Sequence, residues 1–316
     1  MRPMKPSNPV VAMAVAETAV TEARVAEAGS ATAPLLVRLR ALRPSLSPAE
    51  DRVAEQVLAD PRGTAAKTIS ELAAAATTSE TTVLRFSKRL GLAGYPRLRL
   101  ALAEESARPR ALSAAQTDIS ASDTIDDVIR KVALADSSAV EETAEQLDRD
   151  ALERAAKVIA SAVRVDLYGS GASAVVGADL QQKLHRIGSL AFAWVDPHIA
   201  LTSAALLGPR DVAIGISHSG TTRETIESVA RARAQGAHTV AITNFPLSPL
   251  ARAADLVLTT AARETAFRSG ATASRIAALT VVDCLFIAVA QRNLRSARKA
   301  LESTRDAVAT HHVGND

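Results

Sequence analysis

Residues 163–187 read VRVDLYGSGASAVVGADLQQKLHRI, a short apolar run followed by a glycine- and serine-rich turn and an amphipathic segment. This succession predicts a strand, a tight turn and a helix. Similar strand-like runs, separated by segments of helical periodicity, follow at 190–195, 212–217, 239–243 and 256–260. Strands that alternate with helices favour a parallel sheet with helices on both faces. We therefore predict an α/β domain with a five-stranded, parallel, doubly wound sheet in the flavodoxin-like order 2-1-3-4-5.

The turns after the first and third predicted strands contain the chemically informative residues. The first turn is Gly169-Ser-Gly-Ala-Ser173, the second is Ser217-His-Ser-Gly-Thr-Thr222, and each opens a predicted helix. Helix N-termini attract anions, phosphate above all, and glycines let a ligand approach the backbone closely. Strands 1 and 3 are neighbours in the predicted order, and ligands bind where that order reverses. The two turns therefore predict one phosphate site at this edge of the sheet.

Two other interpretations of these turns remain open. The sequence Gly169-Ser-Gly-Ala-Ser-Ala174 fits the dinucleotide-binding pattern G-x-G-x-x-G/A, and Asp196 ends the second strand about where a ribose-binding acid belongs. That interpretation leaves the second hydroxyl-rich turn unexplained, and no separate domain with dehydrogenase machinery is evident. Alternatively, both turns are plain connections between a strand and a helix. Two hydroxyl-rich turns after strands 1 and 3 favour the phosphate site.

Upstream, residues 33–109 carry apolar side chains at helical spacing and predict an all-α domain. Within it, one helix is expected to end near Ala76, and Ser79 can cap the next helix by accepting a backbone N–H. Helix, short turn and helix form the unit that reads the DNA major groove. The second helix has an inward apolar face and an outward polar face, formed respectively by Val83, Phe86 and Leu90 and by Thr81, Arg85 and Lys88.

The outward face of this second helix is positively charged. Five basic residues and no acidic ones lie between Thr81 and Ala103. An acid-free basic run on a groove-sized helix is typical of phosphate binding, and arginine can also bind guanine bidentately. The alternative is a generic amphipathic helix pair with a solvated basic face. The residues predicted to contact double-stranded operator DNA are Ser79, Thr81, Thr82, Arg85, Lys88, Arg89 and Arg99.

The N-terminal motifs resemble a known family. The segments LSPAE (46–50), ISELA (69–73), SETTVLRF (79–86), RLGL (89–92) and GYP (94–96) are similar to the helix-turn-helix domain of the RpiR family of sugar-metabolism regulators. The resemblance implies a DNA-binding transcription regulator. The family usually has a glycine and then an aliphatic residue in the turn, where this chain has Thr77-Thr78. A non-glycine residue is expected to strain a left-handed turn position.

The C-terminal half, from about residue 150 to 292, resembles the sugar isomerase (SIS) domain. Its two turns match the phosphosugar motifs of that domain, and segments 264–271 and 274–276 are similar to a later segment of its regulator branch. The resemblance implies that hydroxyls of both turns hold the phosphate of a sugar phosphate. The residues predicted to bind this ligand are Gly169, Gly171, Ser173, Ser217, Ser219, Gly220, Thr222 and Glu264, with the phosphate held by Ser173, Ser217, Ser219 and Thr222.

The composition limits the classes of function. The chain has 316 residues, enough for about two domains, and a formal net charge of +3. Its single cysteine, Cys284, excludes an intramolecular disulfide and a multi-cysteine metal site, and no metal or cofactor is predicted. No apolar run approaches the length of a membrane span, which favours a cytoplasmic protein without a membrane partner. We predict a disordered leader (1–32), a helix-turn-helix domain (33–109), a linker and connecting helix (110–149), an SIS domain (150–292) and a C-terminal helix and tail (293–316).

These features predict a transcription regulator of sugar or amino-sugar metabolism, not an enzyme, whose DNA affinity responds to a bound sugar phosphate. The alternative is a phosphosugar isomerase with an accessory helical domain, with Glu264 as the base and His218 as a proton shuttle. A single recognition helix reads only a few base pairs, so we expect a homodimer or homotetramer. The apolar helix expected at about 271–290 is the predicted interface.

Overall fold

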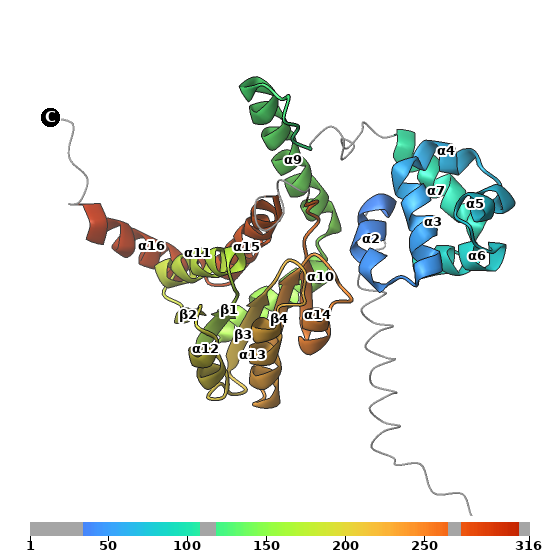
Figure 1. Ribbon diagram of the computed structural model, residues 1–316. Helices are drawn as coiled ribbons and strands as arrows, with labels where there is room; N and C mark the ends of the chain where they lie inside the picture. The colour runs from blue at the N-terminus through green and yellow to red at the C-terminus, as the bar shows by residue number, and fades with distance from the viewer. Residues whose placement is uncertain (1–33, 108–117, 265–272, 310–316) are drawn as a thin grey trace, which may run out of the picture.

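The computed structural model describes residues 34–107, 118–264 and 273–309, which form a helical N-terminal domain and an α/β domain (Figure 1). The predicted leader, part of the linker, the 265–271 motif and the end of the tail lie outside the described residues. The N-terminal elements are α2 (Leu35–Leu42), a short 3-10 helix (Arg43–Ser45), α3 (Pro48–Ala59), α4 (Pro61–Ala66), α5 (Ile69–Ala75), α6 (Glu80–Arg89) and α7 (Tyr95–Ala107).

One apolar core holds the N-terminal domain together. Its fully buried members come from five helices and include Leu39, Val53, Leu72, Phe86 and Leu98. Both α3 and α5 begin with a capping box, in which a hydroxyl residue and the glutamate three positions later bond each other's backbone. These caps fix where α3 and α5 start.

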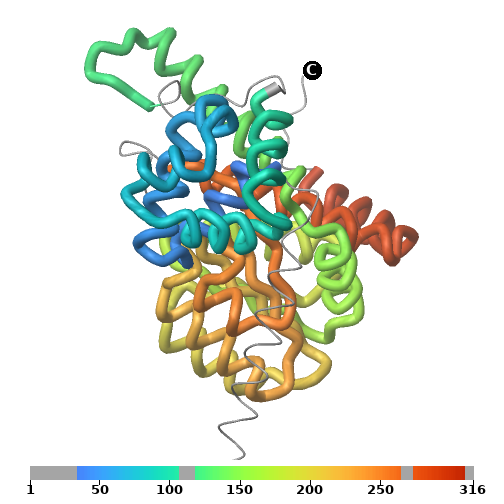
Figure 2. Tube along the Cα trace, turned by 90° about the vertical axis from the view of Figure 1, so that its right-hand side faces the viewer, coloured from blue at the N-terminus to red at the C-terminus, as the bar shows by residue number. Residues whose placement is uncertain are grey.

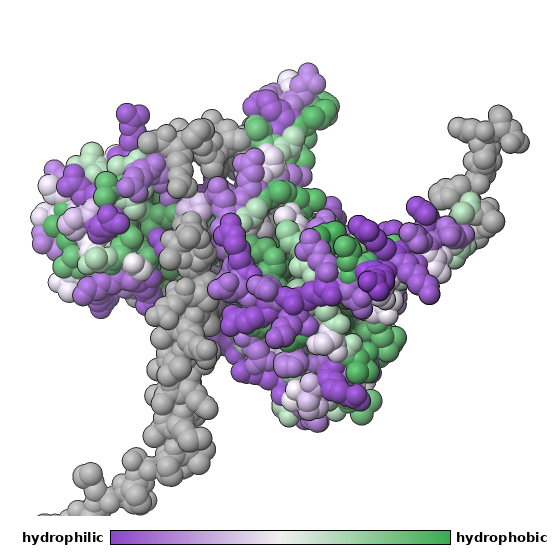
Figure 3. Space-filling view, turned by 180° about the vertical axis from the view of Figure 1, so that it is seen from behind, coloured by the Kyte–Doolittle hydropathy of each residue, from purple (hydrophilic) through white to green (hydrophobic). Residues whose placement is uncertain are grey.

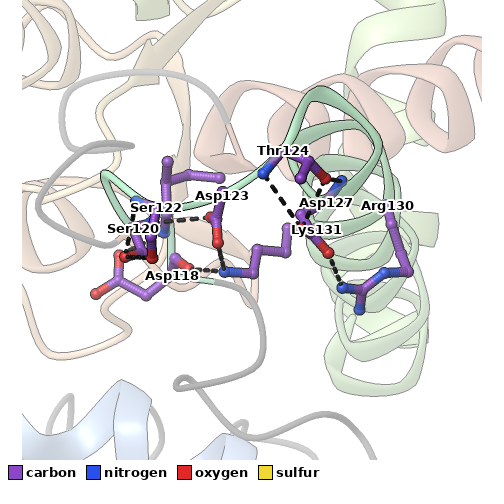
Figure 4. Close-up of polar contacts among 9 residues, drawn as sticks. Asp118, Ser120, Ser122, Asp123, Thr124, Asp127, Arg130 and Lys131 are labelled. Carbon is purple, nitrogen blue, oxygen red and sulfur yellow. Dashed lines mark hydrogen bonds and ion pairs between the residues drawn. The ribbon is translucent and has the colours of Figure 1, made fainter.

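The helix α9 (Ile125–Gln146) precedes the α/β domain. The next helix along the chain, α10 (Arg149–Ser161), leads into β1. Figure 4 shows how polar contacts fix the start of α9, where Thr124 Oγ1 lies 2.7 Å from the Asp127 carboxylate. Hydrogen bonds from Thr124 and Arg130 lower the pKa of Asp127 to about 2. Nearby, Lys131 Nζ donates to Asp123 at 2.7 Å. The helix start is thus capped by an ionised carboxylate at neutral pH.

The α/β domain contains the predicted five-stranded parallel sheet. Its strands are β1 (Arg164–Tyr168), β2 (Ala191–Trp194), β3 (Asp211–Ile216), β4 (His238–Thr243) and β5 (Leu256–Thr259), in the order β2-β1-β3-β4-β5. In the register of the central pair, Leu167 of β1 lies opposite Ile214 of β3. The carboxyl ends of β1 and β3 are therefore adjacent at the point where the strand order reverses.

Helices cover both faces of this sheet (Figures 1 and 2). One face carries α10, α11 (Ala172–Arg186) and α15 (Ala273–Arg292), and the other carries α12 (Pro197–Ala204), α13 (Arg223–Ala234) and α14 (Pro249–Ala253). Val165 and Leu167 pack on the first face and Tyr168 on the second, as alternation along a strand requires. In both views, α16 (Leu294–Ala309) extends away from the domain.

The helix α15 is long and apolar enough to cross a membrane by length and composition, so the expectation about apolar runs was wrong. Ala277, Val281 and Leu285 are fully buried, however, and α15 packs against α9, α10 and α11. Much of its apolar surface thus serves the core of its own domain. Less of it remains for the subunit interface that the sequence suggested.

Some short elements lack a clear signal in the sequence. The helices α4 and α14 each begin with a proline after a capping residue, Asp60 or Ser248, and are too short to show a periodic pattern.

Asp196 accepts backbone N–H groups of His198 and Ile199 at 2.8 and 3.0 Å and caps α12. This capping role accounts for the residue that the dinucleotide interpretation assigned to ribose binding.

Candidate functional site

The turn between α5 and α6 has the predicted cap and the predicted left-handed residue. Ser79 Oγ accepts the backbone N–H of Thr82 at 3.2 Å and caps α6. Thr77 has a φ of 48° and is the sole non-glycine residue with positive φ in the described ranges. Arg52 of α3 donates to the carbonyls of Ala76 and Thr77 at 3.0 and 2.9 Å. These bonds hold the turn in its strained conformation.

The faces of α6 are those that its sequence predicts. Val83, Phe86 and Leu90 are buried in the domain core. Thr81, Arg85 and Lys88 are exposed on the opposite side, and the Arg85 side chain is 62% exposed. With Ser79 at the helix start, they form an exposed polar surface on α6, which also includes Leu84 at 40% exposure. Backbone N–H groups at such a start, together with basic side chains, suit a DNA phosphate and a groove.

Three other residues predicted to contact DNA have partners within the domain. Thr82 is buried, and its hydroxyl lies 3.0 Å from that of Ser79. Arg89 donates to a carbonyl of the 3-10 helix at 2.9 Å, and Arg99 donates to a carbonyl of α4 at 3.0 Å. These contacts give the three side chains a structural role besides any contact with DNA.

A buried carboxylate lies beneath the basic face of α6. Glu50 of α3 is 3% exposed and accepts the backbone N–H and the hydroxyl of Ser47 at 3.0 and 2.7 Å. Its oxygens lie 3.9 Å from Arg85 Nε and 3.8 Å from Arg89 Nη1. Burial alone would raise the pKa of Glu50, but the Ser47 hydrogen bonds and the two arginine charges outweigh it and lower that pKa. The carboxylate thus lies within ion-pair distance of both arginines, a contact that the sequence motif did not reveal.

The two hydroxyl-rich turns lie together at the carboxyl edge of β1 and β3, as the strand order predicts. Gly171, at the start of α11, and Gly220, in the second turn, have φ values of 59° and 64°. A Cβ on Gly220 would lie 2.0 Å from the Ser248 hydroxyl, and a Cβ on Gly169 would lie 2.9 Å from the Ser173 carbonyl. Close backbone approach thus requires glycine at residues 169 and 220.

A small hollow opens beside the two turns. Its polar lining comes from the starts of α11 and α15, the second turn and the ends of β4 and β5, through Ser173, His218, Thr243, Thr260, Ser274 and Arg275. Two helix N-termini and a guanidinium make this environment favourable for an anion. Thr243, Thr260 and Arg275 were not predicted as ligand contacts, although the position of the threonines at the carboxyl ends of buried strands was a usable signal.

The predicted phosphate ligands differ in where their hydroxyls point. Ser173 lines the hollow. The hydroxyl of Ser217 lies 2.8 Å from that of Thr222 and accepts the N–H of Gly220 at 3.1 Å. The hydroxyl of exposed Ser219 lies 2.8 Å from that of the neighbouring Thr221. The hydroxyls of the second turn therefore bond each other in this structure.

His218 and Glu264 lie close together near the hollow, with Nε2 and Oε1 3.8 Å apart. The same Glu264 oxygen accepts the hydroxyl of Ser274 at 2.7 Å. Burial lowers the pKa of His218, and the negative charge of Glu264 opposes this shift only in part. Nδ1 of His218 is buried without a hydrogen-bond partner in the described chain. A neutral imidazole with such a nitrogen can bond a ligand hydroxyl.

Together, the domains define a class of protein, the DNA-binding transcription regulators with a sugar isomerase-type domain. Residues 34–109 match the model of the rpiR-family helix-turn-helix domain, and residues 158–288 match that of the SIS domain. The chain belongs to the RpiR family of transcriptional regulators. It is 32% identical to the transcriptional regulator RpiR of Escherichia coli over 266 residues, which cover 84% of this chain and 89% of that protein.

Other relatives match the chain over most of its length. An uncharacterized helix-turn-helix-type transcriptional regulator of Caldanaerobacter subterraneus is 38% identical over 282 residues, covering 89% of this chain and 99% of the relative. Among solved structures, the Vibrio vulnificus NanR protein complexed with ManNAc-6P is 29% identical, with a TM-score of 0.57. That match covers 88% of this chain and all of the NanR chain, 100%. The order of the two domains is thus shared with a protein solved with a sugar phosphate.

Proposed function

We propose that this regulator binds operator DNA through α6 and that a sugar phosphate in the hollow modulates its DNA affinity. One observation carries the proposal. The same chain presents an exposed basic face on α6 and a hollow where Ser173, His218 and Arg275 meet two helix N-termini. The complex of NanR with ManNAc-6P supports a sugar phosphate as the class of ligand. The protein would then act in the cytoplasm without catalysing a reaction.

The proposed ligand set combines the lining of the hollow with the two turns. A phosphate near the α11 and α15 N-termini would accept backbone N–H bonds and the Arg275 charge. His218 Nδ1 would meet a sugar hydroxyl. The turn residues proposed to contact the ligand are Gly169, Gly171, Ser173, Ser217, Ser219, Gly220 and Thr222, with Glu264 beside the sugar.

The test compares operator affinity with and without a panel of aldose and ketose phosphates, using an operator fragment selected from genomic DNA. Loss of the Ser173 hydroxyl from a charged phosphate should cost about 1.5–3 kcal/mol of ligand affinity. Ser173→Ala should therefore bind the operator normally but respond to the ligand only at roughly 10- to 150-fold higher concentration. Ser170→Ala is the matched control, because Ser170 is exposed in the same turn and does not line the hollow. An unchanged response in Ser173→Ala would place the ligand elsewhere.

A second candidate function is sugar-phosphate isomerisation. The observation that favours it is the proximity of His218 and Glu264, a possible acid and base, at 3.8 Å. Incubation of the protein with each sugar phosphate and analysis of the products by NMR separates the two functions. Turnover by a protein that has no affinity for DNA would reverse our ranking.

A further inference from the structure

A buried carboxylate lies between the two domains. Glu142 of α9 is 6% exposed. Its Oε2 accepts Arg40 Nη1 of α2 at 2.8 Å, and its Oε1 pairs with Arg263, which follows β5. Figure 1 shows α2 as the helix of the N-terminal domain that lies next to α9. One carboxylate is therefore shared by an arginine of the DNA-binding domain and an arginine of the α/β domain.

The three charges depend on one another. Burial lowers the pKa of Arg40, Glu142 acts in the opposite direction, and the like charge of Arg263 lowers it further. The Arg40 and Arg263 side chains are 25% and 24% exposed, so water screens their repulsion only in part. Glu142 is what allows the two cations to lie close together. A displacement of either arginine must therefore change the environment of the other.

The segment 260–263 leads from the hollow to this carboxylate. Thr260 lines the hollow, and its carbonyl accepts Gln146 Nε2 of α9 at 3.4 Å. The next residue, Ala261, donates its N–H to Thr143 Oγ1 of α9 at 3.0 Å. Ala262 then packs in a small apolar cluster with residues of α9 and α15. The segment is thus fixed to α9 along its length up to Arg263.

The far end of the segment also adjoins the proposed ligand site. Glu264 follows Arg263 directly and contacts His218 and Ser274, both of which line the hollow. A ligand that engages these residues acts on the residue next to Arg263. Coupling between two sites requires a physical element that both sites bias. The ion triad formed by Arg40, Glu142 and Arg263 lies where such an element would be needed, because it joins the two domains.

We infer that Glu142 couples the sugar-phosphate site to the DNA-binding domain by sharing its carboxylate between Arg263 and Arg40. The inference rests on the proposed function. Ligand contact at Glu264 changes the ion pair between Arg263 and Glu142. This change alters the position of α2 relative to α9. Glu142 touches neither ligand nor DNA and acts as a positioning residue. Loss of its charge should remove the effect of ligand binding on DNA affinity without abolishing the binding of either ligand or DNA.

The test uses the full-length protein with Glu142→Gln, Arg40→Met and the control Arg43→Met. Arg43 pairs with Asp51 at 2.6 Å on the surface of the DNA-binding domain. Calorimetry with the sugar phosphate that binds the wild type gives ligand affinity, and fluorescence anisotropy gives operator affinity with and without it. Thermal unfolding shows whether each variant folds, and Arg40→Met leaves the α/β domain intact if Glu142→Gln does not fold.

In the wild type, the sugar phosphate should change operator affinity roughly 5- to 150-fold, the usual range of coupling between sites. In Glu142→Gln and Arg40→Met this ratio should approach one, while Arg43→Met keeps the wild-type ratio. A folded variant that binds the sugar phosphate and still shows the wild-type ratio would overturn the role of Glu142 alone. A wild type that binds none of the phosphates would overturn the proposed function itself, and the coupling with it.

Discussion

Thr77 holds a backbone conformation that its side chain disfavours. For a residue with a Cβ, the left-handed region costs roughly 1–2 kcal/mol. Replacement by glycine removes this cost, but glycine's extra freedom in the unfolded chain offsets part of the gain. Thr77→Gly should therefore raise the free energy of unfolding by about 0.5–1 kcal/mol. The Arg52 bond to the carbonyl of residue 77 would persist, because it involves the backbone.

Urea unfolding monitored by circular dichroism measures this effect. Thr78→Gly is the control, since Thr78 lies in the same turn without a positive φ. It should leave stability unchanged or lower it. A Thr77→Gly variant that is less stable than the wild type would mean that contacts of the threonine side chain outweigh the backbone strain.

His218 should make the stability of the α/β domain depend on pH. Burial lowers its pKa below the ordinary value of 6.5, so the unfolded chain binds a proton that the folded chain resists. The contribution of His218 to stability is complete above about pH 6.5 and is lost as the pH falls toward its lowered pKa. His218→Gln should therefore lose less stability than the wild type between about pH 8 and about pH 5. The exposed His198, replaced by Gln, is the control, and equal pH dependence of the His218 variant and the wild type would contradict the effect.

Residue patterns predicted backbone roles better than side-chain contacts. The Ser79 cap follows from a local rule about helix starts, and the left-handed Thr77 follows from the resemblance to a family that usually has glycine in this turn. The bond between the Ser217 and Thr222 hydroxyls depends on two rotamers within one turn, which no sequence rule specifies. Arg275 was missed for a different reason. Its place beside the hollow depends on how α15 returns to the sheet after a long connection.

At the scale of elements, we expect different residues of α6 to contribute to specific and to nonspecific DNA binding. Arg85 is exposed on the face that can enter a groove, so Arg85→Ala should cost about 1–3 kcal/mol for the operator if it contacts a base. Lys88→Ala should weaken binding to all sequences and reduce the salt slope by about one. Binding isotherms for operator and random DNA at several salt concentrations measure both effects. Unchanged affinities in both variants would move the DNA surface away from α6.

The contact between α3 and α6 supports a sharper test. Glu50→Gln keeps the capping box, because glutamine can still accept the Ser47 bonds, but it removes the charge near Arg85 and Arg89. We expect discrimination between operator and random DNA to fall several-fold, while the variant remains folded. Glu71→Gln changes the equivalent capping position of α5, which is exposed, and should keep wild-type discrimination. If the two variants behave alike, the carboxylate of Glu50 has no part in orienting the arginines.

Element order was largely predictable and element length was not. Five apolar strands alternating with helices restrict the topology strongly, because parallel strands need crossover helices. The helices α4 and α14 depend instead on a proline and a cap within one or two turns. The role of α15 could not be predicted either. A continuous apolar helix suits a subunit interface and a domain core equally well, and here the core takes Val281, Leu285 and their neighbours.

For the whole molecule, exposed apolar residues point to self-association. Figure 3 shows apolar side chains at the surface of α9 and below it on the α/β domain. On α9, Ile125 and Ile129 are 75% and 62% exposed, and on α16, Leu294 and Val308 are 46% and 50% exposed. Large apolar side chains that remain exposed are candidate contacts for an interaction site. The helices α9 and α16 are therefore interface candidates beside α15, on which Ile287 is 52% exposed.

The expected mode of operator recognition also favours the predicted dimer or tetramer. A two-fold assembly places two α6 helices on half-sites about one helical turn apart, roughly 34 Å, and thereby multiplies the contacts of a single recognition helix. Sedimentation at micromolar concentration should show no stable monomer.

Ile129→Glu would place a charge in an α9 interface, so it should both shift the protein toward monomer and weaken operator binding. Leu206→Glu is the control, because Leu206 is 79% exposed but follows α12 on the other face of the sheet. If Ile129→Glu remains assembled like the wild type, α9 is not the interface, and a wild type that sediments as a monomer would exclude two-fold operator recognition by a preformed assembly.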